Sequence, residues 1–183
     1  GPAFSTIWVL LATGLQRNAF RARLLARSPD AVQFGVELFD FYAFYRRLLD
    51  VAGDPQRQLA EPARYHVLRH VIGALRERGE LELYGPIAHL PGFIAQAGTL
   101  ISELKQALVF PQDFAAVADE RGPRDRDLAR IYTAYQDFLH TRRLVDRHGA
   151  GWLALEHVEA NPSLAAHVDL LVVDGFDQFN AVH

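Results

Sequence analysis

Apolar and polar residues follow two different periods in the N-terminal part of the chain. Residues 7–12 form a short apolar run that is typical of a buried strand. Over residues 15–26, apolar side chains recur at helical spacing and arginines lie between them. Residues 32–38 alternate between apolar and polar and predict a second strand, and Asp40 is placed to cap a helix over residues 41–51. Strand, helix, strand and helix in this order predict the beginning of an α/β sheet.

The middle of the chain has a different pattern, in which helices follow one another without a convincing strand. The predicted helices cover residues 61–78, about 86–108, 111–120, 125–143 and 149–159. Glycines and prolines separate them. We therefore expect an α-helical insertion over residues 53–159, between two parts of an α/β core, residues 1–52 and 160–183.

A second apolar run, Leu170-Leu-Val-Val173, ends abruptly at Asp174. Four consecutive apolar residues are typical of a central parallel strand that is buried on both faces. Parallel strands need a crossover connection of about a dozen residues or more, which a long insertion provides. This strand is therefore expected to return the chain to the sheet, beside one of the two N-terminal strands.

The composition is that of a soluble globular protein, with 50% hydrophobic and 22% charged residues among 183. No apolar run approaches the roughly 20 residues of a membrane span, and no signal-peptide pattern is present, so we expect a cytoplasmic protein with no membrane contact. The absence of cysteine excludes disulfides, thiol nucleophiles and thiolate metal sites. The chain also lacks methionine and stops about where a second half of the sheet would begin, so we expect a piece of a longer protein.

The charge balance limits how the chain can contact DNA. Lys105 is the only lysine among 19 basic residues, but an arginine bias also follows from a GC-rich genome and is poor support for nucleic-acid binding. The net charge of −3 excludes a wholly basic DNA-coating protein. Any DNA contact must therefore use a local patch.

The first candidate patch lies where the first strand leads into the first helix. Free N–H groups and the positive dipole end of a helix suit a phosphate, so Thr13, Gln16, Arg17 and Asn18 are candidate contacts to a DNA backbone. From spacing alone, a solvated amphipathic helix with arginines on its wet face is the more frequent explanation.

The aromatic stretch after the second strand is a second candidate. Phe41, Phe44 and Tyr45 recur at helical spacing and are expected in the core. Phe39 and Asp40 lie at the corner between strand and helix, where an aromatic ring can stack on an exposed base. These two residues therefore join the predicted DNA site.

Other motifs give little sign of chemistry. His66 and His70 have the spacing of a shared metal site, but no third ligand is apparent and surface or packing roles are favoured. Asp125 and Asp127 indicate a charged helix start. The chain has no GxSxG elbow and no glycine-rich phosphate loop ending in Lys-Ser or Lys-Thr.

Asp174 is the candidate for binding the metal of a nucleotide. An acidic residue at the carboxyl end of such a strand lies at the crevice where open α/β sheets bind ligands, and in P-loop motors it holds Mg²⁺. The alternative is a cap of the element that follows the strand. The next residue is Gly175, which has no side chain to serve hydrolysis.

Taken in order, five blocks resemble those of superfamily-one (UvrD/RecB-like) helicases. They are Leu10-Leu-Ala-Thr13 with Arg23-Leu24, residues 36–44, Ile131-Tyr-Thr-Ala-Tyr135, Leu144-Val-Asp146, and Val173-Asp-Gly-Phe-Asp-Gln-Phe-Asn180. The likeness is strongest to the AddB/RexB-type subunit of bacterial ATP-dependent helicase–deoxyribonucleases, which carries Gly after the Asp of the last block. The second block departs from the superfamily because it lacks a His.

This resemblance implies a partial RecA-like, P-loop NTPase-type core that ends in a degenerate Walker B-like motif. The whole protein would process broken DNA ends for recombinational repair, together with a catalytic AddA-like helicase–nuclease partner. This region would track a single DNA strand and be inactive by itself. ATP and Mg²⁺, with Asp174 as a metal ligand, would belong to the full-length protein, and none is expected here. An authentic ATPase motor and a non-enzymatic module that docks a partner remain as alternatives.

Overall fold

A computed structural model describes residues 5–27 and 35–183. The chain divides into two compact units. The first contains residues 1–55, 150–181 and 183, and the second contains residues 56–149 and 182. Residues 32–34 of the second predicted strand lie outside the described residues.

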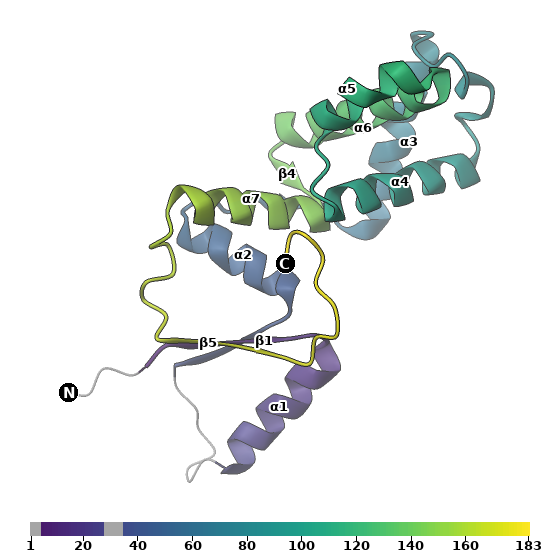
Figure 1. Ribbon diagram of the computed structural model, residues 1–183. Coiled ribbons are helices and arrows are strands. Elements are labelled where there is room, and N and C mark those ends of the chain that lie inside the picture. The colour runs from purple at the N-terminus through teal and green to yellow at the C-terminus, as the bar shows by residue number, and fades with distance from the viewer. Residues whose placement is uncertain (1–4, 28–34) are drawn as a thin grey trace. The chain divides into compact units, whose positions relative to one another are not determined.

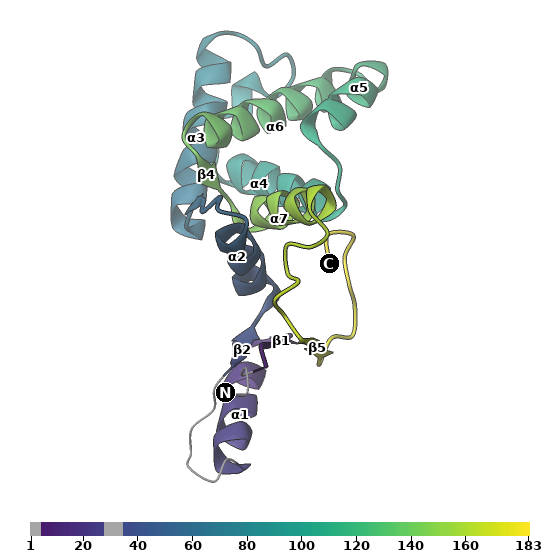
Figure 2. The same ribbon diagram turned by 90° about the vertical axis from the view of Figure 1, so that its left-hand side faces the viewer.

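Three parallel strands of the described residues form the sheet of the first unit (Figure 1), in the order β2-β1-β5 that the labels of Figure 2 show. They are β1 (Ile7–Leu11), β2 (Val36–Phe39) and β5 (Leu170–Asp174). The predicted return of the chain to the sheet is confirmed, because β5 pairs with β1 in parallel along its whole length. The chain is thus α/β, with a small parallel sheet and mostly helices.

The predicted central position of β5 is wrong within the described part of the chain. The central strand is β1, whose residues Trp8 to Leu11 are at most 2% exposed. In β5, by contrast, Leu170, Leu171 and Val173 are 51%, 50% and 47% exposed. The apolar run is typical of a strand that is buried on both faces. Among the described residues, however, β5 has a neighbouring strand on one side only and lies at the edge of the sheet.

Two helices follow the N-terminal strands and lie on opposite sides of the sheet (Figure 1, Figure 2). They are α1 (Gly14–Arg27) and α2 (Phe41–Val51). Asp40 caps α2 as predicted, because its side chain accepts a hydrogen bond from the Ala43 N–H. A third helix, α7 (Arg147–Ala160), belongs to this unit from Ala150 onwards.

The aromatic residues of α2 are half-buried in a cluster of rings. Phe44 packs edge-on against Trp8 of the central strand, with ring centroids 5.7 Å apart. Phe41 contacts Phe176 and stacks on His183, at centroid distances of 4.8 and 3.9 Å. The predicted core position of Phe41, Phe44 and Tyr45 is therefore confirmed only in part, because all three pack against other rings but none is fully buried.

The second unit is mostly helical. Its helices are α3 (Glu61–Glu77), the short 3-10 helix η1 (Gly85–Ile87), α4 (Pro91–Gln106), α5 (Pro111–Arg121) and α6 (Pro123–Thr141). Ile72, Ile101 and Tyr132, from three of these helices, are at most 2% exposed and mark the core. No helix among the described residues is long and apolar enough to cross a membrane.

The prediction that no strand lies between residues 61 and 159 is wrong at one place. A two-residue strand, β4 (Leu144–Val145), pairs in parallel with another, β3 (Arg57–Gln58). The Leu59 N–H extends this pairing by donating to the Val145 carbonyl at 2.8 Å. A strand of two residues is too short to show alternation, so periodicity cannot reveal it.

Candidate nucleic-acid interface at the sheet edge

The three parallel strands end at one edge of the sheet. Leu10 pairs with Phe39 and Leu11 pairs with Asp174, so β1, β2 and β5 end side by side. Thr13 follows β1, and Asp40 follows β2. The sheet therefore brings the predicted site residues to the edge at which open α/β sheets bind ligands.

Thr13 and Gln16 fix each other at the start of α1. The Thr13 hydroxyl accepts a hydrogen bond from the Gln16 N–H at 3.2 Å. The Gln16 side-chain oxygen accepts from the Thr13 N–H at 3.0 Å and from its hydroxyl at 3.2 Å. This reciprocal pair is a capping box, which satisfies donors at the helix start and holds both side chains in place.

The Arg17 side chain connects α1 to the corner after β2. Its Nη1 is 3.3 Å from the Asp40 Oδ2, while the Asp40 Oδ1 accepts from the Ala43 N–H at 2.8 Å. Both side chains of the ion pair are about one-third exposed, so it adds little stability. Its effect is to hold a guanidinium group with further free donors at the sheet edge.

Gly175 brings the backbone after β5 against Gln16. Its φ of +77° lies in the left-handed region, and a Cβ added here would lie 2.8 Å from the Gln16 Nε2. A side chain at position 175 would therefore have to displace the end of the Gln16 side chain, and the positive φ itself favours glycine. The neighbouring Asp174 is exposed, and its carboxylate has no hydrogen bond or ion pair with any described residue.

Two other predicted site residues differ in exposure. Phe39 is only 8% exposed and packs edge-on against Trp8, with ring centroids 5.6 Å apart. A base cannot stack on this ring in the described arrangement, so we assign Phe39 to the packing of the sheet. The Asn18 side chain is exposed and available to a ligand.

The positive charge of α1 extends along the whole helix and is not limited to its first turn. The helix contains four arginines and no acidic residue, and none of its residues is buried. The four are Arg17, Arg21, Arg23 and Arg27. Sequence reasoning placed the last three on a solvated face, but the absence of any carboxylate from the helix was a usable sign of a positive surface.

The residues fit a metal only in a limited way. Among the described residues, no group of three or more His, Cys, Asp or Glu lies close enough to hold a metal ion. Asp174 would supply a single ligand, which suits Mg²⁺ held mainly by phosphate and water oxygens. Among the described residues, no third side chain completes a metal site with His66 and His70.

Comparison with known proteins identifies the family. A family model described as "ADDB, N-terminal" matches residues 20–183. The chain belongs to this AddB N-terminal family. A curated relative, an ATP-dependent helicase/deoxyribonuclease subunit of the B type from Moorella thermoacetica, is 32% identical over 155 residues. That alignment covers 79% of this chain and 13% of the relative, and the family match begins after Thr13, Gln16, Arg17 and Asn18.

Sequence reasoning missed a buried carboxylate in the helical unit of this AddB-type chain. Asp127 is fully buried and accepts hydrogen bonds from the N–H groups of Glu82, Leu83 and Tyr84 at 2.8–2.9 Å. Its sequence position suggested an ordinary charged start of a helix. The three N–H groups lie more than forty residues away, so no local pattern reveals them.

A buried ion pair was missed for the same reason. The Lys105 Nζ donates to the Asp146 Oδ2 at 2.8 Å, and the Tyr135 hydroxyl donates to the same oxygen at 2.9 Å. Burial lowers the pKa of Lys105 and raises that of Tyr135. Burial alone would raise the pKa of Asp146, but the Lys105 charge and the hydrogen bonds hold it below its usual value.

Proposed function

We propose that this chain is a degenerate, RecA-like DNA-tracking domain within a helicase–nuclease subunit that processes broken DNA ends for recombinational repair. Membership of the AddB N-terminal family supports the role in such a complex. The observation that carries the DNA-binding part is the sheet edge, where the start of α1 and the Arg17 guanidinium lie beside the ends of three parallel strands.

Phosphate binding is the chemistry that this edge supports best. The capping box uses the Thr13 and Gln16 N–H groups, which leaves those of Gly14 and Leu15 for a phosphate at the positive end of the helix dipole. Arg17 adds a fixed cation, and the remaining arginines of the helix extend the positive surface without an opposing carboxylate in α1. Asn18 adds an exposed amide. We propose that Thr13, Gln16, Arg17 and Asn18 hold the backbone of a single strand without reading its sequence.

We propose binding without hydrolysis because of Gly175. Glycine has no side chain, so position 175 supplies no acid to orient a water molecule. Should the full-length protein bind ATP, Asp174 would contribute a ligand to its Mg²⁺. The printed name of the relative describes a subunit, and we propose that the whole protein pairs with a catalytic helicase–nuclease partner.

Titration of a labelled single strand at several salt concentrations tests the proposed interface. Binding should be weak and salt-dependent, because it is driven by counterion release. Loss of one phosphate contact in Arg17→Ala should lower the slope of log affinity against log salt by about 0.7. Arg46→Ala is a matched control, since Arg46 is an exposed arginine of α2 on the other side of the sheet. Binding that ignores both salt and Arg17 would reject the interface and favour a partner-docking scaffold.

A further inference from the structure

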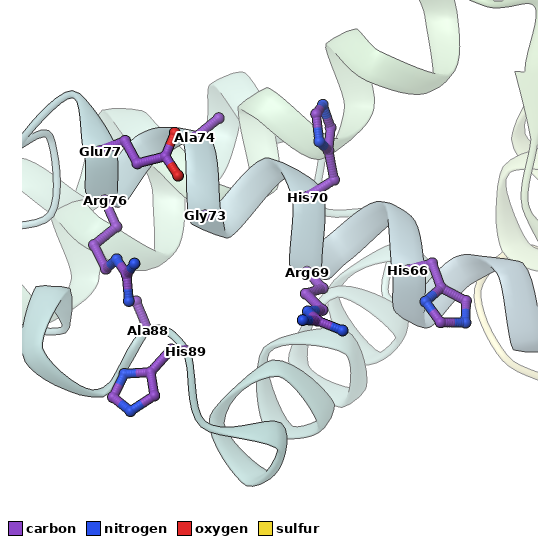
Figure 3. Close-up of a pocket in the computed structure, with 9 residues that line it drawn as sticks. All are labelled: His66, Arg69, His70, Gly73, Ala74, Arg76, Glu77, Ala88 and His89. Carbon is purple, nitrogen blue, oxygen red and sulfur yellow. The ribbon is translucent and has the colours of Figure 1, made fainter.

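The helical unit contains a second basic surface, which the α1 site does not include. A pocket of about 500 Å³ lies along α3 and the loop that follows it (Figure 3). We call it the α3 pocket. The residues that matter for its chemistry are His66, Arg69, Gly73, Arg76, Glu77 and His89.

The polar side chains of the α3 pocket are unevenly distributed. His66, Arg69, Arg76 and His89 point to the same side of α3, whereas Glu77 points to the other side (Figure 3). Among the described residues that line the pocket, Glu77 is the only acidic one. The open side of the pocket therefore presents two guanidinium groups and two imidazoles without a carboxylate among them.

Arg69 and Arg76 are not neutralised by the described part of the protein. Both are exposed, and neither forms an ion pair or side-chain hydrogen bond with a described residue. Other arginines in and just after the same helix differ, because Arg64 pairs with Glu61 and Arg78 pairs with Glu80. Two unpaired cations beside a hollow surface attract an anion more strongly than isolated arginines on a convex face.

Gly73 keeps the wall of the pocket open. It lies inside α3, where glycine is a poor helix former. Apart from the neighbouring backbone of α3, no atom of the described residues lies within 4 Å of a Cβ built on it. A residue here could therefore have a side chain without a clash, and its absence lets a ligand approach the helix backbone closely.

The spacing of the arginines favours a ligand with several charges. Arg69 and Arg76 are seven residues apart, which is about 10 Å along a helix axis. Figure 3 shows their guanidinium groups lying apart rather than converging on one point. Two separate phosphates suit this arrangement better than a single small anion. The planar guanidinium group of an arginine can donate two parallel hydrogen bonds to the oxygens of one phosphate.

We propose that the α3 pocket binds phosphate groups of a single nucleic-acid strand, independently of sequence. This inference rests on the proposed function for the choice of DNA as the polyanion, and it adds a second contact surface on the other unit. Arg69 and Arg76 would bind the phosphates, and His66 and His89 would donate further hydrogen bonds.

Titration of a labelled single-stranded oligonucleotide against the 183-residue chain tests this proposal. The variant Arg69→Ala/Arg76→Ala should weaken binding several-fold and lower the salt slope by about 1.4, as expected for two lost phosphate contacts. Arg78→Ala is the matched control, because Arg78 follows the same helix but is paired with Glu80. Its affinity and slope should equal those of the wild type.

Gly73 provides a test that leaves both arginines in place. Gly73→Glu should fill the pocket with a negative charge and weaken binding several-fold, whereas the neutral Gly73→Gln of similar size should weaken it less. Because the site has room for a side chain and glycine is a poor helix former, neither variant should lower the melting temperature. Equal binding by Gly73→Glu and the wild type would overturn the proposal.

The outcomes separate this inference from the proposed function. If Arg17→Ala weakens binding and the pocket variants do not, the α3 pocket is rejected and the α1 interface stands. If the pocket variants weaken binding and Arg17→Ala does not, the α1 interface is rejected and the α3 pocket stands. Inorganic phosphate and an unlabelled oligonucleotide should also be compared as competitors at the same total concentration of phosphate groups. If inorganic phosphate displaces the labelled strand equally well, the pocket binds single anions and the strand proposal is overturned.

Discussion

Gly175 shows how one residue can decide the chemistry of the sheet edge. In the helicase pattern that this chain resembles, an acid follows the strand-ending Asp. Here the backbone at that position has a φ of +77°, and Gln16 lies against it. An L-residue is therefore disfavoured twice, by its own backbone and by its neighbour. The sequence alone shows that the acid is missing, whereas the contact between Gly175 and Gln16 is visible only in the structure.

The variant Gly175→Ala should lower the free energy of unfolding by about 1–3 kcal/mol because of this strain. Urea denaturation monitored by circular dichroism would measure it. In the Gln16→Ala background the same substitution should be less damaging, since the close contact disappears while the backbone strain remains. A fully stable Gly175→Ala variant would show that the turn relaxes easily and that position 175 can accept a side chain.

Lys105 and Asp146 form a buried ion pair that sequence reasoning missed. Removing one partner leaves the other charge buried, so Lys105→Met should destabilise the chain by about 3–5 kcal/mol. The double variant Lys105→Met/Asp146→Leu should lose less free energy of unfolding than the two single variants lose together. A double-mutant cycle would measure the difference. Additive losses would mean that the two groups do not stabilise each other. Arg121→Met, on an exposed arginine of the same unit, is the control.

At the scale of elements, the sequence predicts a segment well when its signals are local. The bounds of α2 agree with those predicted, because Asp40 caps the helix and its apolar residues repeat at helical spacing. The burial of β5 was predicted wrongly, since the cover of a strand depends on segments distant in sequence. The pair β3 and β4 was missed because each strand has two residues.

Asp127 anchors the segment between α3 and η1 to α6. Its carboxylate accepts from three consecutive N–H groups, at Glu82, Leu83 and Tyr84. An unsatisfied buried donor costs about 1–3 kcal/mol, so Asp127→Ala should destabilise the chain by at least that much. Hydrogen exchange should accelerate most at these three amides. Unchanged protection there would show that other groups hold the segment. Asp137→Ala, on an exposed residue of the same helix, should change neither quantity.

At the scale of the whole molecule, topology was more predictable than environment. Because parallel strands tolerate long connections, β5 was expected beside β1 or β2, and it pairs with β1 despite the helical segment between them. The same rule brought the ends of all three strands to one edge, and hence Thr13, Asp40 and Asp174 with them. The burial of Phe39 could not be foreseen, because the residue at a strand's end faces either the crevice or the core.

We expect that this chain does not hydrolyse ATP. Phosphate transfer needs a cation on the nucleotide phosphates and a group that positions the attacking water. The sequence contains no glycine-rich loop ending in Lys-Ser or Lys-Thr, and its only lysine, Lys105, is buried in the ion pair with Asp146. Gly175 also supplies no side chain at the position where an acid would be needed. Phosphate release measured with and without single-stranded DNA should therefore be the same for the wild type and Asp174→Ala. DNA-stimulated turnover that Asp174→Ala abolishes would show that the sheet edge is a working motor site.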